Sequence, residues 1–331
     1  MLYVTIQPRY SIFLDTDVTG SFIVDASISY LFGESYGNAS NPSGKLPADV
    51  SALTLNISYD GTNLFAASVP INSTGNIVEF SLIHFEPRYE PYQILLSGVS
   101  GNEARVYSAS TEIYVLPSRS YGSAVKIDNL YGGLYVQNSK NNWTGWYPVF
   151  PNGGYADGGH VTPSNISFKN LEKYVALGFN NINIVPDGGR PDQAYPMDEL
   201  KVYWDHMDEA NLLNVYDLRF AYQNSTRISE QVETWKNRTT LLMWYTADEP
   251  DGWVHPLNAT KLAYDQLKEL DPYHPVSLVL NCQNFYYKEY ASGGDIIFED
   301  AYPVAINATW SIPVRRAEIH QRSKLLTLIY S

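Results

Sequence analysis

Residues Leu241 to Gly252 read LLMWYTADEPDG, and this stretch decides the fold class. Its uninterrupted apolar run is typical of a parallel strand that is covered on both faces. The run ends in Asp248, Glu249 and Asp251, with a proline between the last two. In a (β/α)8 barrel the catalytic groups lie at the C-terminal ends of the strands. We therefore predict a barrel strand here, with its carboxylates at the functional rim.

Glu249 and Asp251 are predicted to have different roles. The aromatic residues Trp244, Tyr245 and Trp253 near Glu249 would shield its carboxyl from water and favour the protonated acid. A protonated carboxylic acid at such a rim suits acid catalysis on a sugar. Asp251 is expected instead to cap the N-terminus of the next helix, because Asp is a preferred capping residue.

The 331 residues divide into two regions of different pattern. Residues 1–122 contain only strand signals, such as the alternation in 52–59 (ALTLNISY), separated by turn clusters such as 60–63 (DGTN). Six or seven short strands with regular turns are typical of an antiparallel, immunoglobulin-like β-sandwich. Residues 118–122 are the expected linker to the second region.

Residues 123–331 alternate strand-like and helical segments, which indicates a parallel sheet built from βα units. The strands expected here are 133–137, 181–186, 213–218, 241–247, 276–281 and 295–300. The first of them, 133–137, is a candidate to pair with 147–150. The helices expected between them are 167–177, 197–210, 228–235 and 259–270. This order is that of a (β/α)8 TIM barrel. Residues 324–330 are the candidate for a seventh strand and the eighth has none, so we expect the barrel to be incomplete.

Composition argues against several classes of partner. The formal net charge is −13 and no run is rich in Lys or Arg, which argues against binding nucleic acid or an anionic membrane. No apolar run approaches the roughly 18 residues of a membrane span. The six histidines show no helical i, i+4 pair, so we predict no metal site and no cofactor. The 27 Tyr and 7 Trp supply flat faces for stacking on a carbohydrate, bound by a monomer.

Nine Asn-X-Ser/Thr sequons, with X other than Pro, point to the secretory pathway. They begin at Asn38, Asn56, Asn72, Asn142, Asn165, Asn224, Asn237, Asn258 and Asn307. With about 25 Asn residues, only about three sequons would arise by chance. We expect a secreted, extracellular glycoprotein whose signal peptide is absent from this chain. The alternative is a cytosolic protein with loops rich in Asn, Ser and Thr.

Polar side chains follow several other predicted strands. These residues are Asp187, Asp217, Arg219, Asn281, Glu299, Asp300 and Tyr302. Because the carboxyl ends of barrel strands meet at one rim, we expect these side chains to converge around Glu249.

Three motifs resemble those of glycoside hydrolases. Residues 245–252 (YTADEPDG) resemble the strand-four signature of clan-A-type glycoside hydrolases, which often reads Asn-Glu-Pro. Residues 146–155 (WYPVFPNGGY) and 295–303 (DIIFEDAYP) are similar to motifs of secreted fungal proteins in the glycoside hydrolase superfamily. The resemblance covers about residues 120 to 310 and implies a TIM-barrel enzyme that cleaves glycosidic bonds.

By this resemblance, Glu249 is the general acid/base. The nucleophile of the clan is a Glu at the end of strand seven, and no Glu follows Leu325. Either the nucleophile is missing from this chain or Asp300 or Glu299 replaces it. The residues expected to bind the sugar are Asp187, Arg219, Tyr245, Asp248, Trp253, Asn281 and Tyr302.

Two other functions remain open from the sequence. One is a catalytically inactive, truncated homologue that binds glycans without cleaving them. The other is a metal-dependent hydrolase with Asp187, Asp217 and Asp300 as ligands. A second carboxylate that faces Glu249 across the barrel mouth would favour the glycosidase over both.

Overall fold

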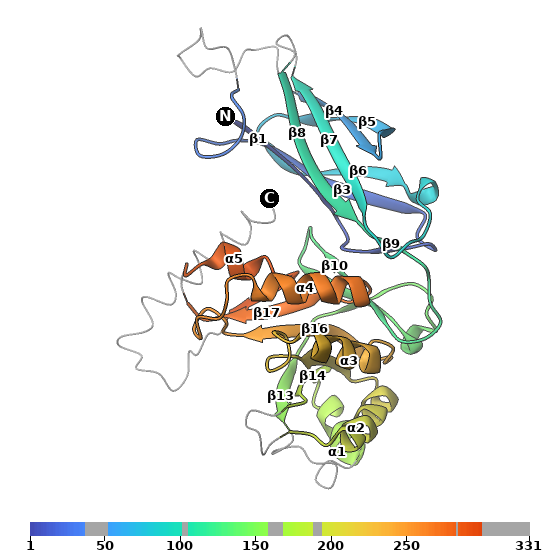
Figure 1. Ribbon diagram of the computed structural model, residues 1–331. Helices are drawn as coiled ribbons and strands as arrows, with labels where there is room; N and C mark the ends of the chain where they lie inside the picture. Colours follow the sequence, from blue (N-terminus) through green and yellow to red (C-terminus); the bar gives the residue numbers. More distant parts are fainter. Residues whose placement is uncertain (37–51, 101–104, 158–167, 188–193, 283, 300–331) are drawn as a thin grey trace. The chain divides into compact units, whose positions relative to one another are not determined.

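The computed structural model describes residues 1–36, 52–100, 105–157, 168–187, 194–282 and 284–299 (Figure 1). The contacts within the chain divide it into two compact units. The first contains Met1–Ser118 and Ile127–Gly132, and the second contains Arg119–Lys126 and the described residues from Gly133 onward. Each unit has its own core and is described by itself.

The first unit is built from two antiparallel sheets. Their strand orders are β1-β3-β6 and β5-β4-β7-β8, and a short parallel pair joins β2 to β9. The strands are β1 (Leu2–Pro8), β2 (Phe13–Leu14), β3 (Thr19–Ile28), β4 (Ala52–Tyr59), β5 (Thr62–Pro70), β6 (Ser73–Ser81), β7 (Tyr92–Ser100), β8 (Arg105–Ile113) and β9 (Val115–Leu116). A 3₁₀ turn, η1 (Leu82–His84), follows β6.

Alternating apolar residues explain how these sheets pack. In β4, Leu53, Leu55 and Ile57 are fully buried, whereas Thr54 and Asn56 between them are exposed. Successive strand residues point to opposite faces, so this pattern gives one apolar face and one solvated face. Apolar side chains of both sheets meet in a single buried cluster. The antiparallel strands predicted for this region are therefore observed.

The second unit contains a six-stranded parallel sheet whose spatial order is the sequence order, β13-β14-β15-β16-β17-β18. A helix connects each strand to the next. In chain order the elements are β13 (Gly153–Asp157), α1 (Phe168–Ala176), β14 (Asn181–Val185), α2 (Met197–Ala210), β15 (Leu213–Asp217), α3 (Ser225–Trp235), β16 (Leu241–Asp248), α4 (Ala259–Leu270), β17 (Val276–Leu280), α5 (Tyr287–Ala291) and β18 (Ile296–Glu299).

The helices pack on one face of this sheet, as Figure 1 shows for α3 and α4 beside β16 and β17. Tyr216 and Trp244 point to that face and join the side chains of α2, α3 and α4 in one buried cluster. Their neighbours Val215 and Tyr245 have the opposite parity and line a pocket on the other face. The unit therefore has an apolar, helix-covered face and a second face that carries the candidate site.

The prediction of the first parallel strand was wrong. The expected pairing of 133–137 with 147–150 is confirmed, since β11 (Gly133–Gln137) pairs with β12 (Tyr147–Val149). The pair is antiparallel and belongs to the separate sheet β10-β11-β12, so it is not part of the parallel sheet. The first parallel strand is β13. It was not predicted because it begins with two glycines, and glycine is depleted in strands. Gly153 is required there, because a Cβ at this position would lie 1.8 Å from the carbonyl oxygen of Asn181.

The sheet that contains β11 and β12 also contains β10 (Ala124–Asp128), and the 3₁₀ turn η3 (Ser139–Asn141) lies between β11 and β12 in sequence. Among the predicted helices, 197–210 and 259–270 are observed with the same bounds as α2 and α4. The third begins earlier than predicted, at Ser225, because the side chain of Asn224 accepts a hydrogen bond of 3.1 Å from the Arg227 N–H. The predicted seventh strand, 324–330, lies outside the described residues.

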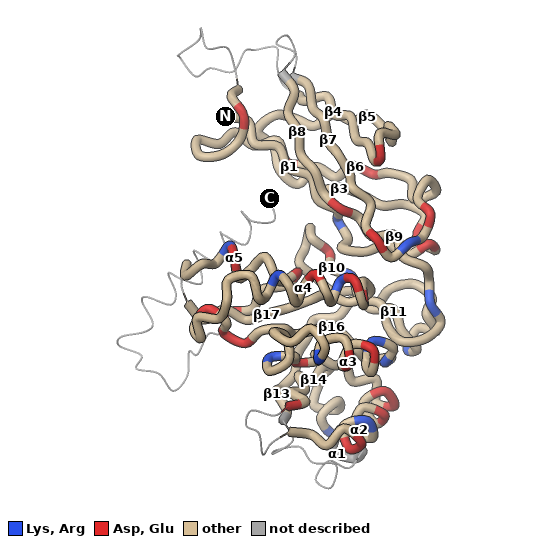
Figure 2. Tube along the Cα trace, viewed as in Figure 1, with Lys and Arg blue, Asp and Glu red and all other residues tan. Residues whose placement is uncertain are grey.

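Acidic and basic residues are interspersed along the described chain (Figure 2). No helix in the described ranges is long and apolar enough to cross a membrane.

Candidate active site

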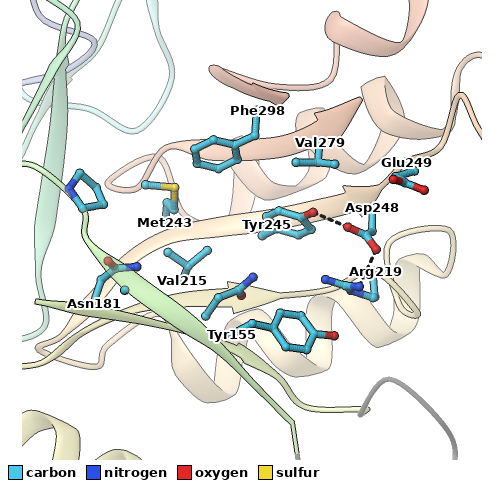
Figure 3. Close-up of a pocket in the computed structure, with 13 residues that line it drawn as sticks. Tyr155, Asn181, Val215, Arg219, Met243, Tyr245, Asp248, Glu249, Val279 and Phe298 are labelled. Carbon is cyan, nitrogen blue, oxygen red and sulfur yellow. Dashed lines mark hydrogen bonds and ion pairs between the residues drawn. The ribbon is translucent and has the colours of Figure 1, made fainter. Parts of the chain in front are cut away.

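A pocket of about 630 Å³ lies on the face of the parallel sheet that points away from the helices (Figure 3). All six parallel strands, or the residues that directly flank them, contribute to it. The lining residues are Pro151, Gly153, Tyr155, Asn181, Asn183, Val215, Arg219, Met243, Tyr245, Asp248, Glu249, Val279 and Phe298. Its volume is that of a small-molecule site.

Arg219 is the centre of the polar network in this pocket. Its Nε and Nη2 donate to the Asp217 carboxylate, with a shortest distance of 2.6 Å. Its Nη1 donates to Asp248 Oδ2 at 2.5 Å, and the Tyr245 hydroxyl donates to Asp248 Oδ1 at 2.6 Å. The guanidinium also lies 5.1 Å from the ring centre of Tyr155. Arg219 therefore bridges the ends of β15 and β16 and fixes the orientation of Asp248.

Burial sets the protonation behaviour of this network. Asp217 is fully buried, and this desolvation raises the pKa of its carboxyl from 3.8 to about 6 against the opposing effect of Arg219. Burial also raises the pKa of the Tyr245 hydroxyl, and the nearby carboxylates of Asp217 and Asp248 raise it further. Tyr245 is therefore a hydrogen-bond donor throughout the ordinary pH range.

Glu249 directly follows β16 and adopts a backbone conformation that is rare for its residue type. Its φ angle is +51°, in the left-handed region. Such a conformation costs roughly 1–3 kcal/mol and persists only where the surrounding structure enforces it. Two hydrogen bonds do so here: the Glu249 N–H donates to the Val279 carbonyl at 3.1 Å, and the Trp253 N–H donates to the Glu249 carbonyl at 3.0 Å. The strained turn places the partly exposed Glu249 side chain in the lining of the pocket.

The loop that follows Glu249 is braced by two tyrosines. The His255 N–H donates to the Pro250 carbonyl at 2.9 Å, and the Tyr290 hydroxyl donates to the His255 carbonyl at 2.6 Å. The Tyr222 hydroxyl lies 2.5 Å from His255 Nδ1. Burial lowers the pKa of His255, which favours its neutral imidazole. This bracing holds the backbone that follows the candidate acid.

Two asparagines of β14 line the pocket and were missed by the sequence analysis. The Oδ1 atoms of Asn181 and Asn183 are buried and have no hydrogen-bond partner among the described residues. A buried acceptor without a donor costs about 1–3 kcal/mol, so a ligand hydroxyl that donates to it is favoured. The signal in sequence is the alternation Asn-Ile-Asn-Ile at 181–184, which puts both amides on one face.

Aromatic rings complete the lining. Tyr155 is half exposed, and Phe298 is 38% exposed. The rings of Tyr245 and Phe298 lie 6.5 Å apart in a stacked arrangement. Of these three aromatic residues, Tyr245 was predicted from the sequence and Tyr155 and Phe298 were not. Flat rings that combine apolar faces with polar groups suit a ligand that has both C–H and O–H surfaces.

Four of the predicted site residues meet in this pocket: Arg219, Tyr245, Asp248 and Glu249. Three others lie outside its lining. Asp187 is held by Arg227 Nη2, which donates to both of its carboxylate oxygens at 2.7 Å. Trp253 is 69% exposed in the loop after Glu249, and Asn281 follows β17. Asp300 and Tyr302 lie outside the described residues.

Asp251 does not cap the next helix as predicted. Its carboxylate accepts hydrogen bonds from the backbone N–H groups of Asn281 at 3.1 Å and Cys282 at 2.6 Å. The residue that precedes α4 is Asn258, and its side chain makes no capping bond. Asp251 instead ties the end of β16 to the end of β17.

No group of three or more His, Cys, Asp or Glu side chains that could hold a metal ion occurs in the described part of the chain. Two of the aspartates considered as metal ligands, Asp187 and Asp217, are each bound by an arginine. This pairing replaces the positive charge that a metal ion would supply.

No protein-family model matches the sequence, and no curated protein matches it. Solved structures with similarity to the chain include an FMN-binding β-glucuronidase from Facaelibacterium prausnitzii L2-6, with 13% identity and a TM-score of 0.40 over 90% of this chain and 42% of that one. A β-glucuronidase from Ruminococcus gnavus in complex with D-glucuronic acid has 13% identity and a TM-score of 0.43, covering 98% of this chain and 52% of that one.

A third similar structure is a GH2 β-galacturonidase from Eisenbergiella tayi bound to galacturonate. It has 15% identity and a TM-score of 0.39, covering 91% of this chain and 50% of that one. The chain thus spans about half of these proteins or less. With TM-scores below 0.5, no residue role is taken from the likeness.

Proposed function

We propose that the second unit is the catalytic part of a glycoside hydrolase in which Glu249 is the general acid/base. The proposal rests on one observation above all: a strained backbone turn at the end of the fourth parallel strand holds Glu249 in the lining of a pocket of about 630 Å³. Strain of this kind is concentrated at active sites. In this proposal the sheet belongs to a (β/α)8 barrel, whose active sites lie at the strand C-termini.

The proposed substrate is a neutral carbohydrate. Sugar hydroxyls would donate to Asn181 and Asn183, and the rings of Tyr155 and Phe298 would contact the C–H faces of the sugar. Among the described lining residues Arg219 is the one cation, and its guanidinium is already paired with two carboxylates. A charged sugar acid would therefore meet an uncompensated negative site, whereas a neutral sugar avoids this repulsion.

The second catalytic carboxylate is proposed to be Asp300, which directly follows β18. Both carboxylates in the described lining, Asp248 and Glu249, come from β16, and Asp248 is bound by Arg219 and Tyr245. A retaining enzyme needs its two carboxyl groups about 5–5.5 Å apart, and an inverting enzyme about 6.5–9.5 Å. β18 lies two strands from β16 in the same parallel sheet, so its C-terminal end is at the same rim. We also propose that the protein acts outside the cell.

A second candidate function is glycan binding without cleavage. The pairing of both Asp217 and Asp248 with Arg219 favours it, because neither carboxylate is available as a nucleophile. A hydrolase and a glycan-binding protein would both bind the carbohydrate, but only the hydrolase would cleave it.

The experiment is to measure both binding and product formation with a panel of neutral oligosaccharides. For a hydrolase, the wild-type protein forms reducing sugar, and Glu249→Gln retains binding while turnover falls roughly 10²–10⁴-fold, the usual size of a general acid–base contribution. Glu289→Gln, on the exposed side of α5, is the matched control and should be unchanged. Binding with no turnover by the wild type identifies the glycan-binding function instead.

A further inference from the structure

The described sequon asparagines all lie at the protein surface. Six of the nine lie in the described residues, and the side chain of each is exposed. They are Asn56, Asn72, Asn142, Asn224, Asn237 and Asn258. An exposed side chain can be modified at its amide nitrogen only where that nitrogen is not bonded within the protein, so the hydrogen bonds of each residue are considered next.

The amide nitrogen of each of these six side chains donates no hydrogen bond within the described structure, whereas the amide oxygen often accepts one. Asn224 Oδ1 accepts from the Arg227 N–H at 3.1 Å, and Asn237 Oδ1 accepts from Arg119 Nη2 at 2.9 Å. Asn72 Oδ1 accepts from the Ile28 N–H at 3.4 Å. These bonds leave Nδ2 open to solvent.

Asparagines outside the sequons commonly use the same nitrogen inside the protein. Asn138 Nδ2 donates to the Thr239 carbonyl at 2.8 Å, and Asn180 Nδ2 donates to the Phe150 carbonyl at 2.8 Å. The others that donate from Nδ2 are Asn76, Asn129, Asn141 and Asn214. All of these donors are buried or half-buried, and exposed asparagines outside the sequons, such as Asn63 and Asn152, donate no bond from Nδ2 within the described structure either. The open amide nitrogen of the six sequon residues therefore follows from their exposure.

We propose that these six asparagines are N-glycan acceptor sites of the folded protein. The co-substrate is an oligosaccharide on a lipid pyrophosphate. In the transfer, the bond between the sugar C1 and the pyrophosphate oxygen breaks, a C1–Nδ2 bond forms, and one amide proton leaves. Since Oδ1 makes the structural bonds, a glycan on Nδ2 preserves them. The inference rests on the proposed extracellular location and is independent of catalysis.

Asn56 has a further role on the outer face of the first unit. It lies in β4 directly opposite Ser97 of β7, and Leu95 and Val99 flank Ser97 on the same face. Leu95 is 53% exposed and Val99 is 40% exposed, and Val99 pairs with Val106 of β8, which is 63% exposed. A glycan on Asn56 would cover this apolar strip, which otherwise favours association between molecules.

The pocket stays clear of this modification. Its two asparagines, Asn181 and Asn183, are followed at the second position by Asn and Val and form no sequon. The glycans are therefore proposed to cover the strip beside Asn56 and the loops and helix ends of the second unit while the candidate site remains open.

Site occupancy provides the test. The full chain is secreted from a eukaryotic host with an added leader, its glycans are removed enzymatically in ¹⁸O-water, and the resulting Asn-to-Asp conversion is mapped by mass spectrometry. We expect conversion at all six sites. The proposal is overturned if the secreted, folded protein carries no glycan at most of them. Because occupancy is read by mass, this outcome is independent of whether the protein hydrolyses a glycan.

A new sequon supplies the matched control. Lys140→Thr changes an exposed residue and creates the motif at Asn138, whose nitrogen is buried and bonded to Thr239. The secreted fraction of this variant should lack a glycan at Asn138. Occupancy equal to that of the natural sites would show that an exposed, unbonded Nδ2 is not what makes these asparagines acceptors and would overturn the inference.

The role of Asn56 is tested by self-association. Asn56→Gln, which removes that glycan, should bind more of a dye specific for exposed apolar surface and sediment as larger species than wild type. Asn258→Gln removes a glycan from a helix start and is the control, expected to behave as wild type. Equal behaviour of the two variants would contradict the covering role of the Asn56 glycan.

Discussion

Two buried aspartates of the second unit respond to pH in opposite directions. Burial raises the pKa of Asp217 to about 6. Burial also acts to raise the pKa of Asp271, but the charge and hydrogen bond of His274 and the indole N–H of Trp244 outweigh it, and the pKa is lowered. Asp217 also accepts hydrogen bonds from Arg219, but desolvation outweighs them and the nearby charge of Asp248 adds to the rise of its pKa. Asp271 Oδ2 accepts from His274 Nδ1 at 2.7 Å and from Trp244 Nε1 at 2.9 Å.

Asp217 makes stability fall as pH rises from about 4 to about 6. Its pKa in the fold is above the unfolded value of about 3.9, so the native state binds more protons than the unfolded state in this window. The loss is at most about 3 kcal/mol, from about 1.4 kcal/mol per pH unit over roughly two units. Urea unfolding at several pH values should show this slope in wild type and not in Asp217→Asn. An identical slope in both proteins would contradict the burial argument.

Asp271 makes a contribution of the opposite sign. Because its folded pKa is depressed, the stability it provides is present above the unfolded pKa of about 3.9 and is lost as pH falls through the folded pKa. Acid unfolding of the wild-type protein should therefore steepen below about pH 4, and Asp271→Asn should lack this component. The comparison is made by circular dichroism between pH 2 and pH 5. A variant that unfolds with the same acid profile as wild type would contradict it.

At the scale of elements, helix starts differ in how well they are capped. Asn224 caps α3 through the Arg227 N–H at 3.1 Å, whereas Asn258 precedes α4 without a side-chain cap bond. In protein made without glycans, Asn224→Ala should lower the free energy of unfolding by about 0.5–2 kcal/mol. Asn258→Ala should change it by much less. Equal losses at both positions would show that the cap bond is not the cause.

The elements that sequence could predict are those whose apolar period is long and undisturbed. α2 and α4 have the predicted bounds because several turns of amphipathic pattern specify them. β13 was missed because glycine is unfavourable in strands, yet Gly153 is needed where the backbone of Asn181 approaches closely. The sequence of one strand does not show how closely a neighbouring strand will approach it. α5 is five residues long, too short for a periodic pattern.

At the scale of the whole molecule, sequence predicted the change from antiparallel to parallel structure and the strand that carries Glu249. It also predicted four residues of the pocket lining, because Arg219, Asp248 and Glu249 follow or end a parallel strand and Tyr245 lies near the end of one. It could not predict that Asp187 is paired with Arg227, since that contact joins elements 40 residues apart. Predicting that Asn181 and Asn183 line the pocket requires the register of β14 with its neighbouring strands, which the sequence does not give.

Proton donation by Glu249 is tested most directly by the leaving-group dependence of turnover in the full-length protein. Aryl glycosides of one neutral sugar are compared for wild type and Glu249→Gln. With leaving groups that need protonation, the variant should be slower by roughly 10²–10⁴-fold, and with a dinitrophenyl leaving group, which departs unprotonated, it should be nearly as fast as wild type. An equal loss for every leaving group would contradict the role of Glu249 as the general acid.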